Sequence, residues 1–274
     1  MYSLNCKGRL LTIDQPLVMG IINMTPDSFY AGSRTVVDDV LHRAEKMMEE
    51  GADILDIGGQ STRPGSSQVN ADEELTRVLP AVDAIHKRFP SQVLSIDSFY
   101  AKVVRETADA GISIVNDVSA GTMDESLLSE VARLKLPYVL MHTRGTPQTM
   151  QQHASYEDVV TEVFDFLSFR IASLTQSGIH DIIVDPGFGF AKTSEHNFKL
   201  VQQLAFFKNL DRPLMVGLSR KATIYKTLGI TAAEALNGTT VMHTAALLNG
   251  ASILRVHDVK EAKEAVQLVS ALNQ

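Results

Sequence analysis

The stretch DIIVDPG, residues 181–187, is a short apolar run that ends on an aspartate, a proline and a glycine. Near-continuous hydrophobicity over so few residues is typical of a parallel strand that is buried on both faces. Seven further runs of this kind recur along the chain: PLVMGIIN (16–23), ADILDIGG (52–59), VLSIDS (93–98), ISIVNDV (112–118), PYVLMHT (137–143), PLMVGLS (213–219) and SILRVHD (252–258). The sequence therefore predicts eight buried parallel strands.

Helical patterns fill the segments between these runs. Over residues 70–89, apolar side chains keep helical spacing behind Asn70, a favourable N-cap, and Pro80 is expected to kink this helix. Another helix is expected to begin with Ser155 as its N-cap and Asp158 three residues further on. The alternation of strand and helix favours an α/β architecture.

The alternation continues through the 274 residues without a linker-like or low-complexity segment. Eight strand–helix units in a single domain, residues 1–274, predict a (β/α)8 TIM barrel. A doubly wound open sheet is the alternative, but no G-x-G-x-x-G motif follows the first run. Residues 2–14 resemble a β-hairpin that turns at Lys7 and Gly8, and we expect it to plug the lower end of the barrel.

Composition narrows the class of protein. The chain is 45% hydrophobic and 21% charged, which is ordinary for a globular protein. A net charge of −7 without a long Lys/Arg run argues against nucleic acid or an anionic membrane as a partner. The single cysteine, Cys6, excludes an internal disulfide, and no run reaches membrane-spanning length. We expect a cytoplasmic protein.

Polar residues stand where the predicted strands end. They are Asn23, Asp97, Asn116, His142 after Met141, Asp185, the triplet Ser219, Arg220 and Lys221, and the pair Arg255 and His257. In a barrel these strand ends share one rim, where the active sites of this fold lie. Asp and Asn at strand ends also cap turns, which is the alternative for each residue taken singly.

Arg255 and His257 are two residues apart in a strand, so both side chains should point to the same side, into the barrel mouth. A buried cation needs an anionic partner. This partner could be Asp258 or a bound anion, towards which Arg63 and Asn23 would also point, Asn23 through a hard ion such as Mg²⁺. A diphosphate or triphosphate would suit this cluster.

Asp97, Asn116, Asp185 and Lys221 offer a different set of groups. Acceptors and an ammonium at one site suit a flat heterocycle whose paired N–H donors bind a carboxylate. Phenylalanines in glycine-containing loops, at Phe29, Phe188 and Phe190, could stack on a second ring or simply anchor their loops in the core.

Eight motifs together resemble the dihydropteroate synthases of the bacterial folate pathway: MGIINMTPDSF, GGQSTRPG, IDS, NDV, LMHTRGTPQTMQ, DPGFGFAK, GLSRK and RVHDV. They follow one another in the family's order from about residue 17 to residue 265. The resemblance implies a (β/α)8 barrel, a homodimer and a magnesium-dependent transferase that sulfonamides inhibit. Its reaction would join 6-hydroxymethyl-7,8-dihydropterin pyrophosphate to p-aminobenzoate, with release of pyrophosphate.

The resemblance also implies roles for individual residues. The pterin would be held by Asp97, Asn116, Met141, Asp185, Gly217, Lys221 and Arg255, and pyrophosphate by Asn23, Arg63, Arg255 and His257, with Asn23 as the metal ligand. The p-aminobenzoate pocket would comprise Thr25, Pro26, Asp27, Ser28, Phe29, Thr62, Arg63, Pro64, Phe190, Ser219 and Arg220. The residues implied in catalysis are Asp97, Asp185, Lys221, Arg255 and His257.

The chain departs from the family pattern at several positions. Gln60 stands where Glu is usual, Ala191 where Gly is usual, and Ala222 where Ser commonly follows the lysine. Two other functions share part of the pattern: a methyltetrahydrofolate methyltransferase and a pterin-binding module without activity. Lys221 and the Arg255 and His257 pair argue against the methyltransferase. Asn23, Arg63, Lys221 and His257 argue against the inactive module.

Overall fold

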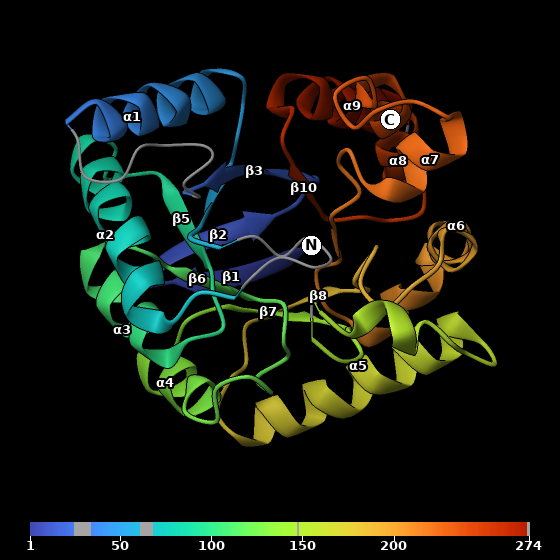
Figure 1. The fold of residues 1–274 in the computed structure, drawn as a ribbon, viewed down its shortest axis with the longest axis horizontal. Coiled ribbons are helices and arrows are strands. Elements are labelled where there is room, and N and C mark those ends of the chain that lie inside the picture. The colour runs from blue at the N-terminus through green and yellow to red at the C-terminus, as the bar shows by residue number, and fades with distance from the viewer. Residues whose placement is uncertain (25–33, 61–67, 147, 273–274) are drawn as a thin grey trace.

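The computed structural model describes residues 1–24, 34–60, 68–146 and 148–272 and shows a ring of helices around a parallel barrel (Figure 1). The strands are β1 (Tyr2–Cys6), β2 (Arg9–Ile13), β3 (Leu17–Asn23), β4 (Ile54–Gly58), β5 (Val93–Asp97), β6 (Ile114–Asp117), β7 (Tyr138–Met141), β8 (Ile182–Asp185), β9 (Met215–Val216) and β10 (Ile253–Val256). Each of the eight predicted runs contains a strand of the barrel.

The eight-stranded sheet has the order β8-β7-β6-β5-β4-β3-β10-β9, and its neighbouring strands are parallel. The two ends of this order meet through a parallel bridge between Val184 and Leu214, where the Val184 N–H donates to Pro213 O at 2.9 Å. The predicted (β/α)8 barrel is therefore confirmed, and the doubly wound sheet is wrong.

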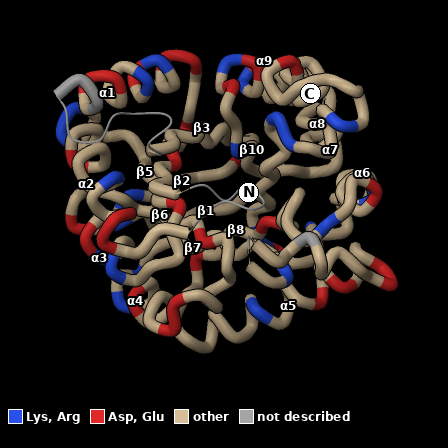
Figure 2. The backbone as a smooth tube through the Cα atoms, viewed as in Figure 1, with Lys and Arg blue, Asp and Glu red and all other residues tan. Residues whose placement is uncertain are grey.

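The helices are α1 (Arg34–Glu49), α2 (Ala71–Arg88), α3 (Ala101–Ala110), α4 (Leu127–Leu134), α5 (Val159–Gln176), α6 (Ser194–Gln202), α7 (Ala222–Leu228), α8 (Leu236–Leu248) and α9 (Val259–Leu272), with 3-10 turns η1 (Met150–His153) and η2 (Leu204–Leu210). Acidic and basic residues are interspersed along α1, α2 and α9 (Figure 2), as expected of a solvated surface. No helix among the described residues is both long and apolar enough to span a bilayer.

The ends of two helices test the predicted caps. The Asn70 side chain accepts from Glu73 N at 2.9 Å and begins α2, as predicted. The prediction of Ser155 as the N-cap of α5 is wrong, because Asp158 caps this helix by accepting from the N–H groups of Val160 and Thr161. Ser155 lies outside the helix, and its carbonyl accepts a hydrogen bond from Arg144.

The hairpin of β1 and β2 turns at Lys7 and Gly8, with Cys6 paired to Arg9, as predicted. Its buried side chains Leu4, Cys6 and Ile13 pack on one apolar layer inside the barrel. The barrel strands supply this layer: Leu17, Met19, Ile54, Val93, Ile114, Val139, Ile183, Met215 and Ile253. The hairpin thus closes the barrel at the amino ends of the strands.

Strand periodicity fixes what lies above this layer. Side chains two residues further along each strand point to the same side, so the next interior layer contains Ile21, Asp56, Ser95, Asn116, Met141, Asp185, Gly217 and Arg255. The intervening residues, such as Leu55, Ile96, Val184 and Leu254, point outward into the core shared with the helices. An apolar floor therefore supports a polar layer towards the carboxyl ends of the strands.

Candidate active site

Arg255 is the centre of the polar layer. Its Nε donates to Asp56 Oδ2 at 2.7 Å, and its Nη2 donates to Asp97 Oδ2 at 2.6 Å. Asn116 Nδ2 donates to the same Asp56 oxygen at 2.9 Å. Residues from four strands, β4, β5, β6 and β10, are thereby joined in one buried network. Arg255 therefore forms ion pairs with Asp56 and Asp97. It does not pair with Asp258, which was the protein partner considered from the sequence.

Asp56 belongs to this network, although the sequence patterns did not single it out. Its side chain is fully buried, and its Oδ1 has no hydrogen-bond partner among the described residues. Ser95 Oγ, on the paired position of the neighbouring strand, is also buried without such a partner. The sequence signal was a single acid at an inward-facing position, two residues after Ile54, in an otherwise apolar strand. Unsatisfied buried acceptors are costly, so this region favours a ligand that brings donors.

Burial shifts the pKa values of the ionisable side chains in and next to this layer. Burial raises the pKa of Asp97, and Arg255 offsets this only in part. The pKa of Asp185 is also raised by burial, against the N–H of Gly187 and the charge of Lys221. Burial disfavours the charge of Arg255, but Asp56 and Asp97 more than compensate and raise its pKa. The layer is therefore a strongly interacting set in which arginine stays cationic.

Lys221 and the loop after β8 form the next side of the site. Lys221 is the N-cap residue of α7, as expected for a helix beginning near this position. Its Nζ donates to Phe188 O at 2.6 Å and lies 4.4 Å from the ring centroid of Phe190. Burial lowers the pKa of Lys221 to about 8, although Asp185 favours the ammonium. Phe188 is buried and anchors the loop, whereas Phe190 is only partly buried.

Ser219 and His257 lie next to each other, just after β9 and β10 respectively. Ser219 Oγ accepts from the backbone N–H of His257 at 3.1 Å and lies 3.0 Å from His257 Nδ1. Burial lowers the pKa of His257 to about 4, and Arg255 lowers it as well. The imidazole is thus neutral at pH 7. When the Ser219 hydroxyl donates to Nδ1, Nε2 carries the imidazole proton.

Arg220 points elsewhere. Its Nε and Nη2 donate to the two carboxylate oxygens of Asp258 at 2.8 and 2.9 Å, and its Nη1 reaches the carbonyls of Ala232 and Ala233. This guanidinium fastens the loop before α8, and its contact with p-aminobenzoate remains a prediction. Met141 and Gly217 lie in the interior layer, and Asn23 ends β3 at the lip.

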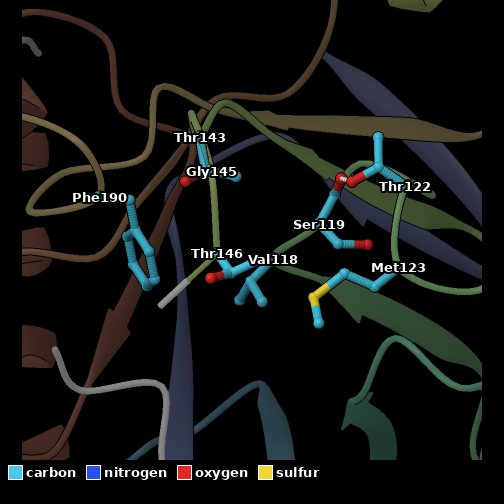
Figure 3. Close-up of a pocket in the computed structure, with 8 residues that line it drawn as sticks. All are labelled: Val118, Ser119, Thr122, Met123, Thr143, Gly145, Thr146 and Phe190. Atoms are coloured by element: carbon cyan, nitrogen blue, oxygen red, sulfur yellow. Dashed lines mark hydrogen bonds between the residues drawn. The ribbon is translucent and has the colours of Figure 1, made fainter. Parts of the chain in front are cut away.

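The remaining implied residues, Thr25, Pro26, Asp27, Ser28, Phe29, Thr62, Arg63 and Pro64, lie outside the described residues. A cavity of about 230 Å³ opens beside Phe190 (Figure 3). Its lining comes from the loops after β6, β7 and β8: Val118, Ser119, Thr122, Met123, Thr143, Gly145, Thr146 and Phe190. This cavity therefore lies among the loops at the carboxyl ends of the strands.

Comparison with known proteins identifies the family. The family model described as pterin binding enzyme matches residues 19–257, which span the strands from β3 to β10. The fold and the site thus define a pterin-binding enzyme.

The relatives define the family more closely. The dihydropteroate synthase of Escherichia coli strain K12 is 42% identical over 269 residues, which cover 97% of this chain and 94% of that protein. The dihydropteroate synthase of Xanthomonas albilineans solved with 4-aminobenzoic acid has a TM-score of 0.91 and 40% identity, covering 99% and 98% of the two chains. The same enzyme in complex with 7,8-dihydropteroate gives a TM-score of 0.89 and 37% identity over 99% of each chain. The chain belongs to the dihydropteroate synthase family.

Proposed function

We propose that this chain condenses 6-hydroxymethyl-7,8-dihydropterin pyrophosphate with p-aminobenzoate to give 7,8-dihydropteroate and pyrophosphate. The observation that carries the proposal is the buried network of Asp56, Asp97, Asn116 and Arg255, beside Asp185 and Lys221, in a member of this family. Such a set matches the donors and acceptors along the edge of a pterin.

Recognition of the pterin would use acids that are already oriented. The Asp185 carboxylate accepts from Gly187 N through Oδ1 at 2.7 Å, and the ammonium of Lys221 interacts electrostatically with it. Asp97 is held by Arg255, so both acids keep fixed positions without a substrate. Preorganised acceptors of this kind favour a heterocycle with N–H donors, and they favour positive charge on it.

The reaction itself requires no covalent enzyme intermediate. The bond between the pterin methylene carbon and the pyrophosphate oxygen breaks, and its electron pair leaves with pyrophosphate. The amine of p-aminobenzoate supplies the electron pair of the new C–N bond and then loses a proton. We propose that Asp97 and Asp185 stabilise positive charge on the pterin, while Arg255 and the Nε2–H of His257 stabilise the leaving group.

Magnesium would be bound with the substrate rather than in a resident site. Asn23 offers one hard oxygen donor at the lip, and the described residues contain no cluster of three or more His, Cys, Asp or Glu side chains suited to a metal. One protein ligand suits Mg²⁺, which keeps waters and binds phosphate oxygens. When bound, the ion would neutralise charge on pyrophosphate. Chelation should abolish activity, and added Mg²⁺ should restore it.

For p-aminobenzoate we propose the region around Phe190, Ser219 and the beginning of α7. Ala222 carries no hydroxyl, so backbone N–H groups at this helix terminus would have to contact the carboxylate. Sulfonamides should compete at the same place. A homodimer and a cytoplasmic location remain proposals that rest on the family resemblance and on the single cysteine.

The decisive experiment mixes the purified protein with both substrates and Mg²⁺ and follows pyrophosphate and dihydropteroate together. Pyrophosphate release that requires p-aminobenzoate, with an equal amount of dihydropteroate, is the expected result. Binding of the pterin without pyrophosphate release would instead indicate a binding module. Methyl transfer from methyltetrahydrofolate would indicate the other enzyme class.

A further inference from the structure

Lys192 is a buried lysine to which the proposed reaction assigns no role. It closes the DPGFGFAK motif and is only 3% exposed. Its Nζ lies 3.0 Å from Gly187 O, 3.0 Å from Phe190 O and 2.9 Å from His142 Nδ1, with His142 O at 3.4 Å. The amino group thus contacts carbonyl and imidazole groups from two loops. Burial lowers the pKa of Lys192 well below its usual value, so keeping an amino group at this position indicates a role beyond packing.

The carbonyls that Lys192 holds belong to the loop that builds one side of the site. Gly187, whose carbonyl it binds, donates its own N–H to the Asp185 carboxylate at 2.7 Å. Phe190, whose carbonyl also accepts from Lys192, carries the ring that Lys221 Nζ faces. Between them, Phe188 O accepts from Lys221 at 2.6 Å. Lys192 and Lys221 therefore donate hydrogen bonds to the carbonyls of neighbouring residues in one short loop.

The backbone of this loop has an unusual conformation. Gly187, Gly189 and Ala191 all have left-handed backbone angles, with φ values of 75°, 80° and 50°. Gly187 also approaches the end of β7 so closely that a Cβ there would lie 1.9 Å from His142 O. Ala191 adopts this conformation without the freedom of a glycine, so side-chain contacts help to hold the loop.

We propose that Lys192 is a positioning residue for the pterin. Its amino group ties residues 186–191 to His142 at the end of β7, and through Gly187 and Phe190 it fixes the Asp185 carboxylate and the aromatic ring. The role rests on the proposed function, because the pterin is the ligand of the positioned groups. Without Lys192, the N–H of Gly187 moves away from Asp185, and the carboxylate loses its orientation.

The test measures equilibrium binding of 6-hydroxymethyl-7,8-dihydropterin pyrophosphate by calorimetry, together with kcat and KM. Lys192→Met keeps the apolar stem and removes the donors, and we expect it to raise the Kd at least tenfold. Lys192→Gln keeps an amide donor and should raise it less. Lys199→Met is the matched control, because Lys199 pairs at the surface with Asp158, the N-cap of α5. This variant should leave the Kd within twofold.

Circular dichroism and thermal unfolding report whether each variant is folded. A folded Lys192→Met variant that binds the pterin within twofold of the parent would overturn the positioning role. Failure of both variants to fold would also overturn it, because Lys192 would then support the whole barrel rather than the site. Absence of pterin binding by the parent protein would instead count against the proposed function.

Discussion

Asp56 determines how Arg255 is presented to a substrate. It accepts from Arg255 and from Asn116 through one oxygen, so a single buried carboxylate orients a cation and an amide. Removing one partner of a buried ion pair costs about 3–5 kcal/mol, because it leaves the other partner under-compensated.

We therefore expect Asp56→Asn to lower kcat/KM for the pterin substrate about a hundredfold, equivalent to about 3 kcal/mol. Steady-state kinetics with saturating p-aminobenzoate measures this. Asp53→Asn is the control, since Asp53 pairs with Lys263 on α9, below the site. Equal losses in the two variants would show that Asp56 acts only through general stability.

Lys221 should give the reaction an alkaline limit. Burial lowers its pKa to about 8, so the ammonium loses its proton as the pH rises through this value, well before an exposed lysine would. Its charge, and with it the interaction with Asp185, is present below pH 8 and lost above it. We expect kcat/KM of the parent to fall above pH 8.

Lys221→Arg tests this assignment, because arginine stays charged over the whole range. The variant should be slower at pH 7 but should lack the alkaline fall. A fall at the same pH in both proteins would assign the alkaline limit to another group.

At the scale of the element, the sequence predicted Ser155 as the N-cap of α5, and the structure has Asp158 in this position. Ser155 and Asp158 are both good N-cap residues, but Glu162 binds the N–H groups of Glu157 and Asp158 and keeps that segment outside the helix. These contacts depend on how the chain enters the helix, and residue type does not reveal this.

Asp158→Ala should lower the free energy of unfolding by about 1 kcal/mol, a typical cost of losing an N-cap. Ser155→Ala should change it by less than about 0.5 kcal/mol. Urea unfolding followed by circular dichroism compares the two variants directly. A larger loss for Ser155→Ala would mean that the helix begins earlier in solution.

On the whole-molecule scale, the barrel was predictable because each strand is a contiguous apolar run that shows its own character. The polar rim was predictable for the same reason, since strand ends are local features. Asp56 was missed because its importance lies in Arg255, 199 positions away in sequence. The sequence also did not show which arginine pairs with Asp258. Arg255 is closer to it in sequence, but the partner is Arg220, which follows the neighbouring strand β9.

The outer surface bears on assembly. Val241 and Leu248 of α8 are 59% and 56% exposed, and Leu268 of α9 is 69% exposed. The two helices pack against each other, and their Ala- and Leu-rich sequences are the candidates for a dimer interface.

Light scattering should give a mass near twice 30.0 kDa for the parent chain. Val241→Glu should shift this mass towards the monomer. Leu10→Glu, at a 65% exposed position of the hairpin, is the control and should not. A monomeric parent at micromolar concentration would contradict the homodimer.

The barrel is closed by a narrow seam, and this has a consequence for how substrates affect the protein. Only one bridge, at Val184 and Leu214, joins β8 to β9 within the described residues, while Asp185 and Lys221 flank this seam from either side. A pterin that binds both residues would link the two sides of this seam. Amide hydrogen exchange at Val184 should therefore slow far more on pterin binding than exchange between β4 and β5, where the closed ladder needs no such fastening.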